Sequence, residues 1–150
     1  MNHLKTLIFM VVFLFGFKGI TYSQVFFGGG LSFNSNSVFN TVGLTGKVGV
    51  WASDKIDLNG NITYYFTNKA SFAFDIDAHY KLFNLGDKLY INPFAGINFT
   101  RMKDIEPNYT NNSLNLGISF RIPSEQYLYF IAPRWILDYK QFVVTIGAIL

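Results

Sequence analysis

The sequence between Ile56 and Leu82 alternates between apolar and polar residues in two consecutive runs. Side chains of a β-strand point to opposite faces with a period of two, so each run predicts a strand with one apolar and one polar face. Each run has about eleven residues, enough for a tilted strand to cross a bilayer, whereas a typical strand in a globular protein has about five or six. The pattern predicts a membrane β-hairpin, apolar outside and polar inside.

The two faces of this hairpin can be assigned residue by residue. The predicted lipid-facing side chains are Ile56, Leu58, Ile62, Tyr64, Phe66, Phe72, Phe74, Ile76, Ala78, Tyr80 and Leu82. The predicted inward side chains are Asp57, Asn59, Asn61, Thr63, Asp75, Asp77, His79 and Lys81.

The overall composition agrees with a membrane barrel. Half of the 150 residues are hydrophobic and 14% are charged, against about 25% charged residues in an ordinary soluble domain. After residue 20 no apolar run reaches the roughly eighteen residues of a membrane helix. There is no cysteine, which excludes disulfides and thiolate metal sites. High hydrophobicity without long apolar runs is typical of strands that present alternate side chains to lipid.

Residues 1–23 have the organisation of a secretory signal peptide. Lys5 supplies the positive charge, residues 7–15 are apolar, and small residues at 21 and 23 precede Gln24. Without Lys5 and Lys18, ten basic residues remain against nine acidic ones, which gives no reason to expect a nucleic-acid partner. We therefore predict an exported domain over residues 24–150.

The same alternation divides that domain into eight candidate strands. Their ranges are 25–34, 41–52, 56–66, 71–82, 88–101, 113–122, 127–135 and 140–150. The seventh is the least regular, because Leu128 and Phe130 fall on its polar face. Pro93 and Pro133 cannot donate a ladder hydrogen bond, so each predicts a bulge or a strand end.

The connections between these strands alternate in character. With both ends of the domain on the periplasmic side, the outer loops are predicted near 35–40, 67–70, 102–112 and 136–139, and the periplasmic turns near 53–55, 83–87 and 123–126. Bacterial barrels have short periplasmic turns and longer outer loops, as the first and third loops here have. In the first strand, Gly28, Gly29 and Gly30 are not followed by the Gly-Lys-Ser/Thr of a phosphate loop, and instead predict a close backbone approach where the barrel closes.

Together, the signal, the eight alternating strands and the apolar terminal strand resemble the small eight-stranded outer-membrane barrels of Gram-negative bacteria, the OmpA-like and OmpX-like β-barrel family. The resemblance covers residues 24–150 and is carried by the pattern. It implies a closed antiparallel barrel in the outer membrane, in contact with lipid and lipopolysaccharide. It also implies a last strand that the barrel assembly machinery recognises, although family members usually end on an aromatic residue and this chain ends on Leu150.

The predicted interior carries charges of both signs. They are Lys47, Asp57, Asp75, Asp77, His79, Lys81, Arg121 and Arg134. An eight-stranded barrel is just wide enough for side chains to fill it, so we expect a paired polar core and not an ion-conducting lumen. Asp75, Asp77 and His79 share one face and could bind a metal or relay a proton, but a single histidine without cysteine is a weak zinc set. We predict no metal, no cofactor and no catalytic residue.

Three alternatives remain open. A lipid-modifying enzyme of the deacylase type would pair a histidine with a serine two residues later, and that position is Lys81 here. A soluble lipocalin-like carrier would have the same period with its faces reversed. A surface-interaction role would use the third outer loop, where Asp104, Glu106, Tyr109, Asn111 and Asn112 lie. The sequence favours a monomeric, non-enzymatic outer-membrane barrel with a structural or surface-interaction role, and identifies no loop partner.

Overall fold

A computed structural model describes residues 25–35, 40–67, 70–102, 109–137 and 141–150. The predicted signal peptide, and Asp104 and Glu106 of the third loop, lie outside these residues. Within them no helix is long and apolar enough to cross a membrane.

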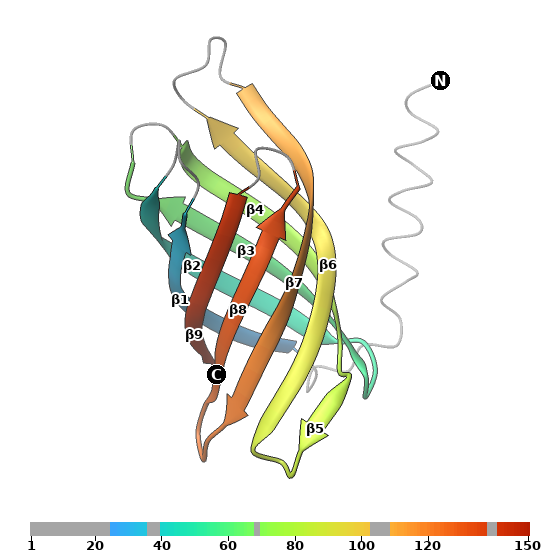
Figure 1. Cartoon of the computed structure of the whole chain (residues 1–150). Helices are drawn as coiled ribbons and strands as arrows, with labels where there is room; N and C mark the ends of the chain where they lie inside the picture. Colours follow the sequence, from blue (N-terminus) through green and yellow to red (C-terminus); the bar gives the residue numbers. More distant parts are fainter. Residues whose placement is uncertain (1–24, 36–39, 68–69, 103–108, 138–140) are drawn as a thin grey trace, which may run out of the picture.

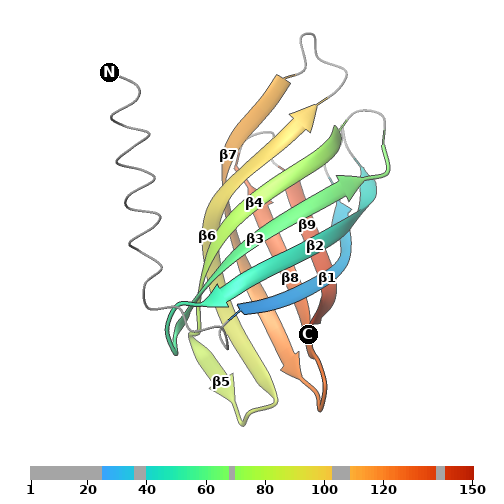
Figure 2. The ribbon, with the colours of Figure 1, turned by 180° about the vertical axis from the view of Figure 1, so that it is seen from behind.

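The described residues form one all-antiparallel sheet that closes on itself (Figures 1 and 2). Eight strands make the wall: β1 (Val25–Asn34), β2 (Thr41–Trp51), β3 (Ile56–Tyr65), β4 (Ala70–Tyr80), β6 (Leu89–Met102), β7 (Tyr109–Pro123), β8 (Leu128–Ile136) and β9 (Gln141–Ile149). Each pairs with its neighbours in the sequence, and β1 pairs with β9 to close the ring. The predicted eight-stranded up-and-down barrel is therefore confirmed.

The seam between β1 and β9 depends on glycine. Gly30 lies opposite Gly147, and a Cβ atom on Gly147 would lie 2.1 Å from the carbonyl oxygen of Gly29. A Cβ on Gly30 would lie 2.2 Å from the carbonyl oxygen of Ile146. The close backbone approach predicted for the glycines of the first strand is thus present at the closing seam.

The barrel has apolar side chains outside and mostly polar ones inside. Large side chains at least 38% exposed occur on every wall strand, among them Phe27, Leu44, Ile62, Phe74, Ile97, Leu114, Trp135 and Ile146. The buried set is dominated by polar residues, among them Ser32, Thr45, Asn59, Asn61, Asn98, Asn115, Arg121 and Gln141. This is the orientation that the hairpin at 56–82 predicts.

The two ends of the barrel differ. At one end, which we call the short-turn end, β2 joins β3, β4 joins β6 and β7 joins β8, and the chain terminus at Leu150 lies close by (Figure 1). At the opposite end, the loop end, lie the ends of β1, β3, β6 and β8 and the starts of β2, β4, β7 and β9 (Figure 2).

The connection between β4 and β6 is more ordered than predicted. Asn84 and Leu85, predicted to be in a turn, belong to a short strand β5 (Phe83–Leu85) that pairs with the start of β6. The turn itself lies at Gly86 and Asp87, which both have positive φ (59° and 57°), as a type I′ hairpin turn requires. Asn84 closes it, because its Oδ1 accepts a hydrogen bond of 2.9 Å from the Asp87 amide.

Both prolines lie at interruptions of the ladder. Between β7 and β8 the pairing skips from Gly117–Arg134 to Phe120–Ile131, and Pro133 lies in the gap. Pro93 lies where β6 changes partner, from β4 at Phe94 and beyond to β5 at Ile91 and before. Pro133 thus lies at an irregularity, as predicted. Pro93 lies inside β6 at neither a bulge nor an end of that strand, and its missing N–H donor falls where the neighbouring strand changes from β4 to β5.

The third loop is shorter than predicted. Residues 109–112, expected in a polar connection, are the first four residues of β7 and pair with residues 99–102 of β6. Asn111 is buried and points into the barrel, so it does not belong to an accessible loop surface. The prediction that loop residues extend from 102 to 112 is wrong because the alternation continues through Asn111, Asn112 and Ser113, whose polar character disguises it.

Candidate functional site: the polar interior

Seven of the eight charged or titratable residues predicted inside the barrel are buried there. They are Lys47, Asp57, Asp75, Asp77, His79, Arg121 and Arg134, each at most 7% exposed. The prediction for Lys81 is wrong. Strand β4 ends at Tyr80, and Lys81, whose amide donates a 2.7 Å hydrogen bond to Lys55 O, is exposed at the end of the barrel. Its Nζ lies 4.7 Å from the centre of the Tyr90 ring. Three bases and three carboxylates thus share the interior with one histidine.

The first buried cluster is built around Arg121 on β7. Its two terminal nitrogens each donate a 2.9 Å hydrogen bond to one oxygen of Asp57 on β3. The same guanidinium lies 3.2 Å from His79 Nδ1, and its Cζ lies 5.4 Å from the centre of the Trp51 ring. A bidentate Arg–carboxylate pair is the strongest common ion-pair geometry, so this cluster ties together opposite walls of the barrel.

The second cluster is built around Arg134 on β8. Its NH1 lies 2.8 Å from one oxygen of Asp75 and 3.6 Å from Asp77. The other Asp75 oxygen accepts hydrogen bonds from the amides of Asn98 (2.7 Å) and Asn115 (3.2 Å). One carboxylate therefore links β4, β6, β7 and β8 through the centre of the barrel.

Three asparagine amides are oriented by these carboxylates. Asn59 donates to Asp57, Asn61 donates to Asp77 over 2.8 Å, and Asn115 donates to Asp75. Their carbonyl oxygens, and one oxygen of Asp77, make no hydrogen bond with the described residues. The Nε donor of Arg134 also makes no hydrogen bond with the described residues, so both acceptors and donors are left over in the middle of the interior.

The third base, Lys47 on β2, lies next to one of these asparagines in the sheet. Asn61 is its direct partner on β3. No carboxylate of the described residues lies within salt-bridge distance of its Nζ, which lies 5.2 Å from the centre of the Phe130 ring.

Hydroxyl and amide groups, together with the buried side chains of Ile136 and Val143, occupy the interior towards the loop end. Ser32 Oγ lies 2.6 Å from Thr45 Oγ1 and 2.7 Å from Thr145 Oγ1, and Thr45 continues the chain to Thr63 over 2.8 Å. This row crosses four adjacent strands, β9, β1, β2 and β3. Polar side chains thus hydrogen-bond one another across the closing seam.

The short-turn end is closed by an apolar cluster that the sequence did not predict. Its buried members are Phe26, Phe94, Phe130, Ala132 and Ile149, with Trp51 and Leu128 packed against them. The Phe94 ring stacks on His79 at 4.4 Å and an interplanar angle of 18°. The irregular positions Leu128 and Phe130 are therefore explained: they follow the inward parity of β8 and belong to this cluster. Phe26 and Phe94 could have been assigned to the interior from the sequence, because each lies an even number of residues from a polar inward residue on its own strand. For Phe26 that residue is Ser32, and for Phe94 it is Asn98.

The arrangement provides charge pairing and packing. The described residues contain no group of three or more histidine, cysteine, aspartate or glutamate side chains placed to hold a metal ion. Asp75 and Asp77 face Arg134, and His79 Nδ1 faces Arg121, so the three residues that share a face of β4 are engaged by two different arginines.

Comparison with known proteins gives a fold relationship. No family model matches the sequence, and no curated protein matches it. Among solved structures, the N-terminal β-barrel domain of Pseudomonas aeruginosa OprF superposes with a TM-score of 0.67 at 14% identity, covering 84% of this chain and 95% of that one. Neisserial surface protein A gives 0.54 at 12% identity, over 84% and 93% of the two chains. The attachment invasion locus protein Ail of Yersinia pestis gives 0.51 at 11% identity, over 85% and 98%. The chain therefore has the fold of the small eight-stranded outer-membrane β-barrels.

Proposed function

We propose that this protein is an integral outer-membrane barrel that contributes to the envelope as a stable, sealed structural element. The observation that carries the proposal is the inversion of the usual protein pattern. Charged residues are buried in the middle of the chain's strands, whereas leucine, isoleucine and phenylalanine side chains cover the outside of the closed wall. In water, so large an exposed apolar surface would promote aggregation, whereas in a bilayer it is solvated by lipid.

The packed interior supports a structural role over conduction. Two arginine clusters cross the barrel, and the apolar cluster around Phe94 and Phe130 closes the short-turn end. A continuous water path would have to pass all three. We expect no steady conductance in planar bilayers, and large steady openings would contradict a sealed interior.

The two alternatives fit the side chains less well. A lipocalin-like carrier needs an apolar interior, but the buried residues of β3 are Asp57, Asn59, Asn61, Thr63 and Tyr65. A lipid-modifying enzyme needs an accessible nucleophile or base, whereas the Nδ1 of His79 faces Arg121 and its ring is 2% exposed beneath Phe94. Unchanged lipid A acylation in cells with and without the protein would remove the enzymatic alternative.

The last strand is suited to the assembly step that we expect for such a barrel. Strand β9 presents Phe142 and Ile146 outward, and the terminal Leu150 is outward and 75% exposed while its amide donates a 2.7 Å hydrogen bond to Phe27 O. We propose that the barrel assembly machinery recognises this apolar row. Replacing Leu150 by aspartate should lower the amount of folded protein in the outer membrane without lowering its export.

The direct test of the proposed function is membrane integration. The mature chain should remain in the membrane fraction after extraction with urea or carbonate. In detergent, the unheated sample should migrate differently from the boiled one, because the closed barrel resists unfolding. Recovery of the protein in the soluble fraction without detergent would contradict the proposal.

A further inference from the structure

We infer that the outer wall at the loop end, where β6 and β7 extend beyond β8, binds one phosphorylated, acylated lipid of the outer leaflet. Arg101 would contact its phosphate, and the depression below would hold its acyl chain. This inference rests on the proposed membrane location.

The depression arises from a step in the wall. Strand β8 ends at Ile136 and its pairing with β7 begins at Asn115, whereas β7 continues to Tyr109. One further hydrogen bond, 2.9 Å from Leu137 N to Leu114 O, ends the described contact between the two strands. Above that point, no described strand neighbours β7 on its β8 side.

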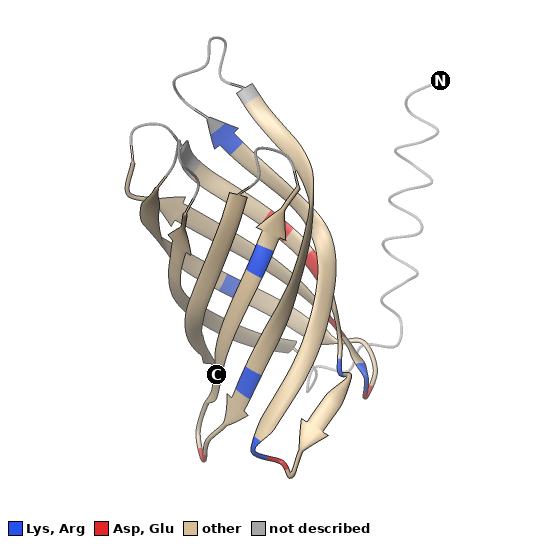
Figure 3. Ribbon diagram, viewed as in Figure 1, with Lys and Arg blue, Asp and Glu red and all other residues tan. Residues whose placement is uncertain are grey.

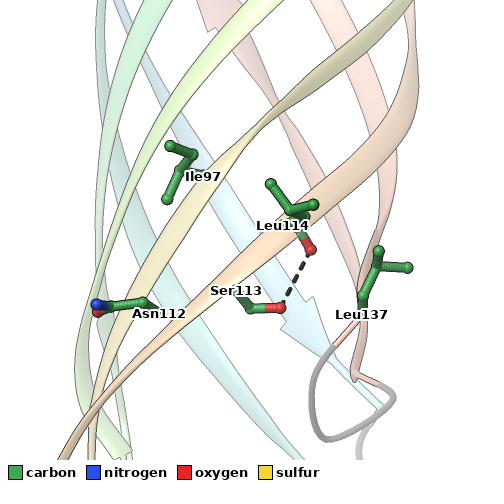
Figure 4. A pocket seen from close by; sticks show the side chains of 5 residues that line it. All are labelled: Ile97, Asn112, Ser113, Leu114 and Leu137. Atoms are coloured by element: carbon green, nitrogen blue, oxygen red, sulfur yellow. Dashed lines mark hydrogen bonds between the residues drawn. The ribbon is translucent and has the colours of Figure 1, made fainter.

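Five residues from three adjacent segments line the depression at this step (Figure 4). They are Ile97, Asn112, Ser113, Leu114 and Leu137, and the open depression has a volume of about 310 Å³. Ile97, Leu114 and Leu137 are 45%, 61% and 47% exposed, so the floor and sides present hydrocarbon to the surroundings. The Ser113 hydroxyl is turned to its own wall, where it donates to Leu114 O over 3.2 Å.

A polar gradient runs from this depression towards the rim. On the outer face of β6 and β7 the direct pairs are Ile97–Leu114, then Phe99–Asn112, then Arg101–Thr110. Successive pairs on one face are about 7 Å apart along a strand. The surface thus passes, within about 13 Å, from two aliphatic side chains through an amide to a guanidinium.

Arg101 lies where a lipid phosphate would be. It is exposed and follows the outward parity of Ile97 and Phe99. The other exposed Lys and Arg side chains of the described residues, Lys55, Lys81 and Lys88, lie in the connections of the short-turn end, whereas Arg101 lies near the loop end of β6 (Figure 3). No ion pair joins it to a described carboxylate. A guanidinium binds phosphate oxygens through paired N–H donors, and the amide of Asn112 lies between it and the apolar floor, at the level of the acyl linkage.

The test compares lipids that differ only in phosphate. The purified full-length mature protein is reconstituted in nanodiscs containing bisphosphorylated lipid A or the same lipid without phosphate, and lipid retention is measured by native mass spectrometry after partial delipidation. We expect the phosphorylated form to be retained about tenfold more, and Arg101→Gln to remove most of that preference. Lys81→Gln, at the opposite end, is the matched control and should keep it. Inorganic phosphate at millimolar concentration should not displace the lipid, because the acyl contact is lost.

The acyl part is tested separately. Leu114→Ala should lower retention of both lipid forms, whereas Leu44→Ala, an outward leucine of similar exposure (57%) on β2, should not. Equal retention of the two lipids, or an Arg101→Gln variant that behaves like wild type, would overturn the inference while leaving an inserted barrel. A chain that fails to insert would overturn the proposed function as well.

Discussion

Removal of the Asp57 carboxylate should be among the most damaging single changes in this barrel. In Asp57→Ala the guanidinium of Arg121 loses two hydrogen bonds of 2.9 Å and remains in the interior, where its side chain is 2% exposed. Breaking a buried ion pair by removing one partner costs about 3–5 kcal/mol, because the other charge is left uncompensated. We therefore expect the free energy of unfolding to fall by about that amount.

Urea unfolding in lipid vesicles, followed by tryptophan fluorescence, measures this loss. Trp51 lies beside Arg121 and Trp135 is outward, so the two report the interior and the lipid side. The double variant Asp57→Leu/Arg121→Met should be more stable than Asp57→Ala by at least about 2 kcal/mol, since it removes both members of the pair and leaves neither charge without its partner. Glu125→Ala, in an exposed turn, is the matched control. A loss below about 1 kcal/mol in Asp57→Ala would show that water screens the pair and would refute a packed interior.

Three further substitutions test the wall and the apolar cluster. Phe74→Arg, near the middle of the eleven-residue strand β4 and facing outward, should cost about 2–4 kcal/mol in the same vesicle assay, and a harmless substitution would mean that this face does not meet lipid. Gly147→Val should abolish the heat-modifiable band, because its Cβ would lie 2.1 Å from Gly29 O, whereas Gly46→Ala, which has open space, should fold normally. Phe94→Ala should lower the free energy of unfolding by about 3–5 kcal/mol, as truncation of a buried phenylalanine does. A loss of only about 0.5 kcal/mol, which is usual for a surface substitution, would contradict the place of Phe94 in the cluster.

The alternation of side chains was sufficient to predict the architecture. One face of every wall strand meets hydrocarbon and the other meets a narrow interior, so the sequence must change polarity with a period of two. This is why Asp57, Asn61, Asp75, Asp77 and His79 could all be assigned to the interior before the fold was known, and all five are buried.

The partners of the interior charges could not be predicted in the same way. Period two gives the face of a residue but not its height in the barrel, which depends on the stagger between strands. Arg134 and Asp75 come from β8 and β4, which are not adjacent in the wall, and only the closed geometry brings them to 2.8 Å. The ion pairs that cross the lumen are therefore set by the register between neighbouring strands.

The predictions failed where the polarity of a side chain does not match the side of the barrel on which it lies. Lys81 continues the polar parity of β4, but the strand has already ended at Tyr80. Phe26 and Phe94 are apolar yet point inward, because the short-turn end of the barrel is filled by packed rings. At both places the environment of the side chain depends on where the strand ends and on how far along the barrel the residue lies. The alternation of polar and apolar residues gives neither.

The central claim is that the apolar outer face of the barrel lies in lipid. The chain has no cysteine, so single cysteines can be introduced and spin-labelled without background. Nitroxides at the outward positions 62, 74 and 114 should be more accessible to oxygen, which partitions into bilayers, than to a water-soluble nickel chelate. A label at position 55, in an exposed turn, should show the reverse. Higher nickel accessibility at 62, 74 and 114 would show that this face lies in water and would contradict the membrane barrel.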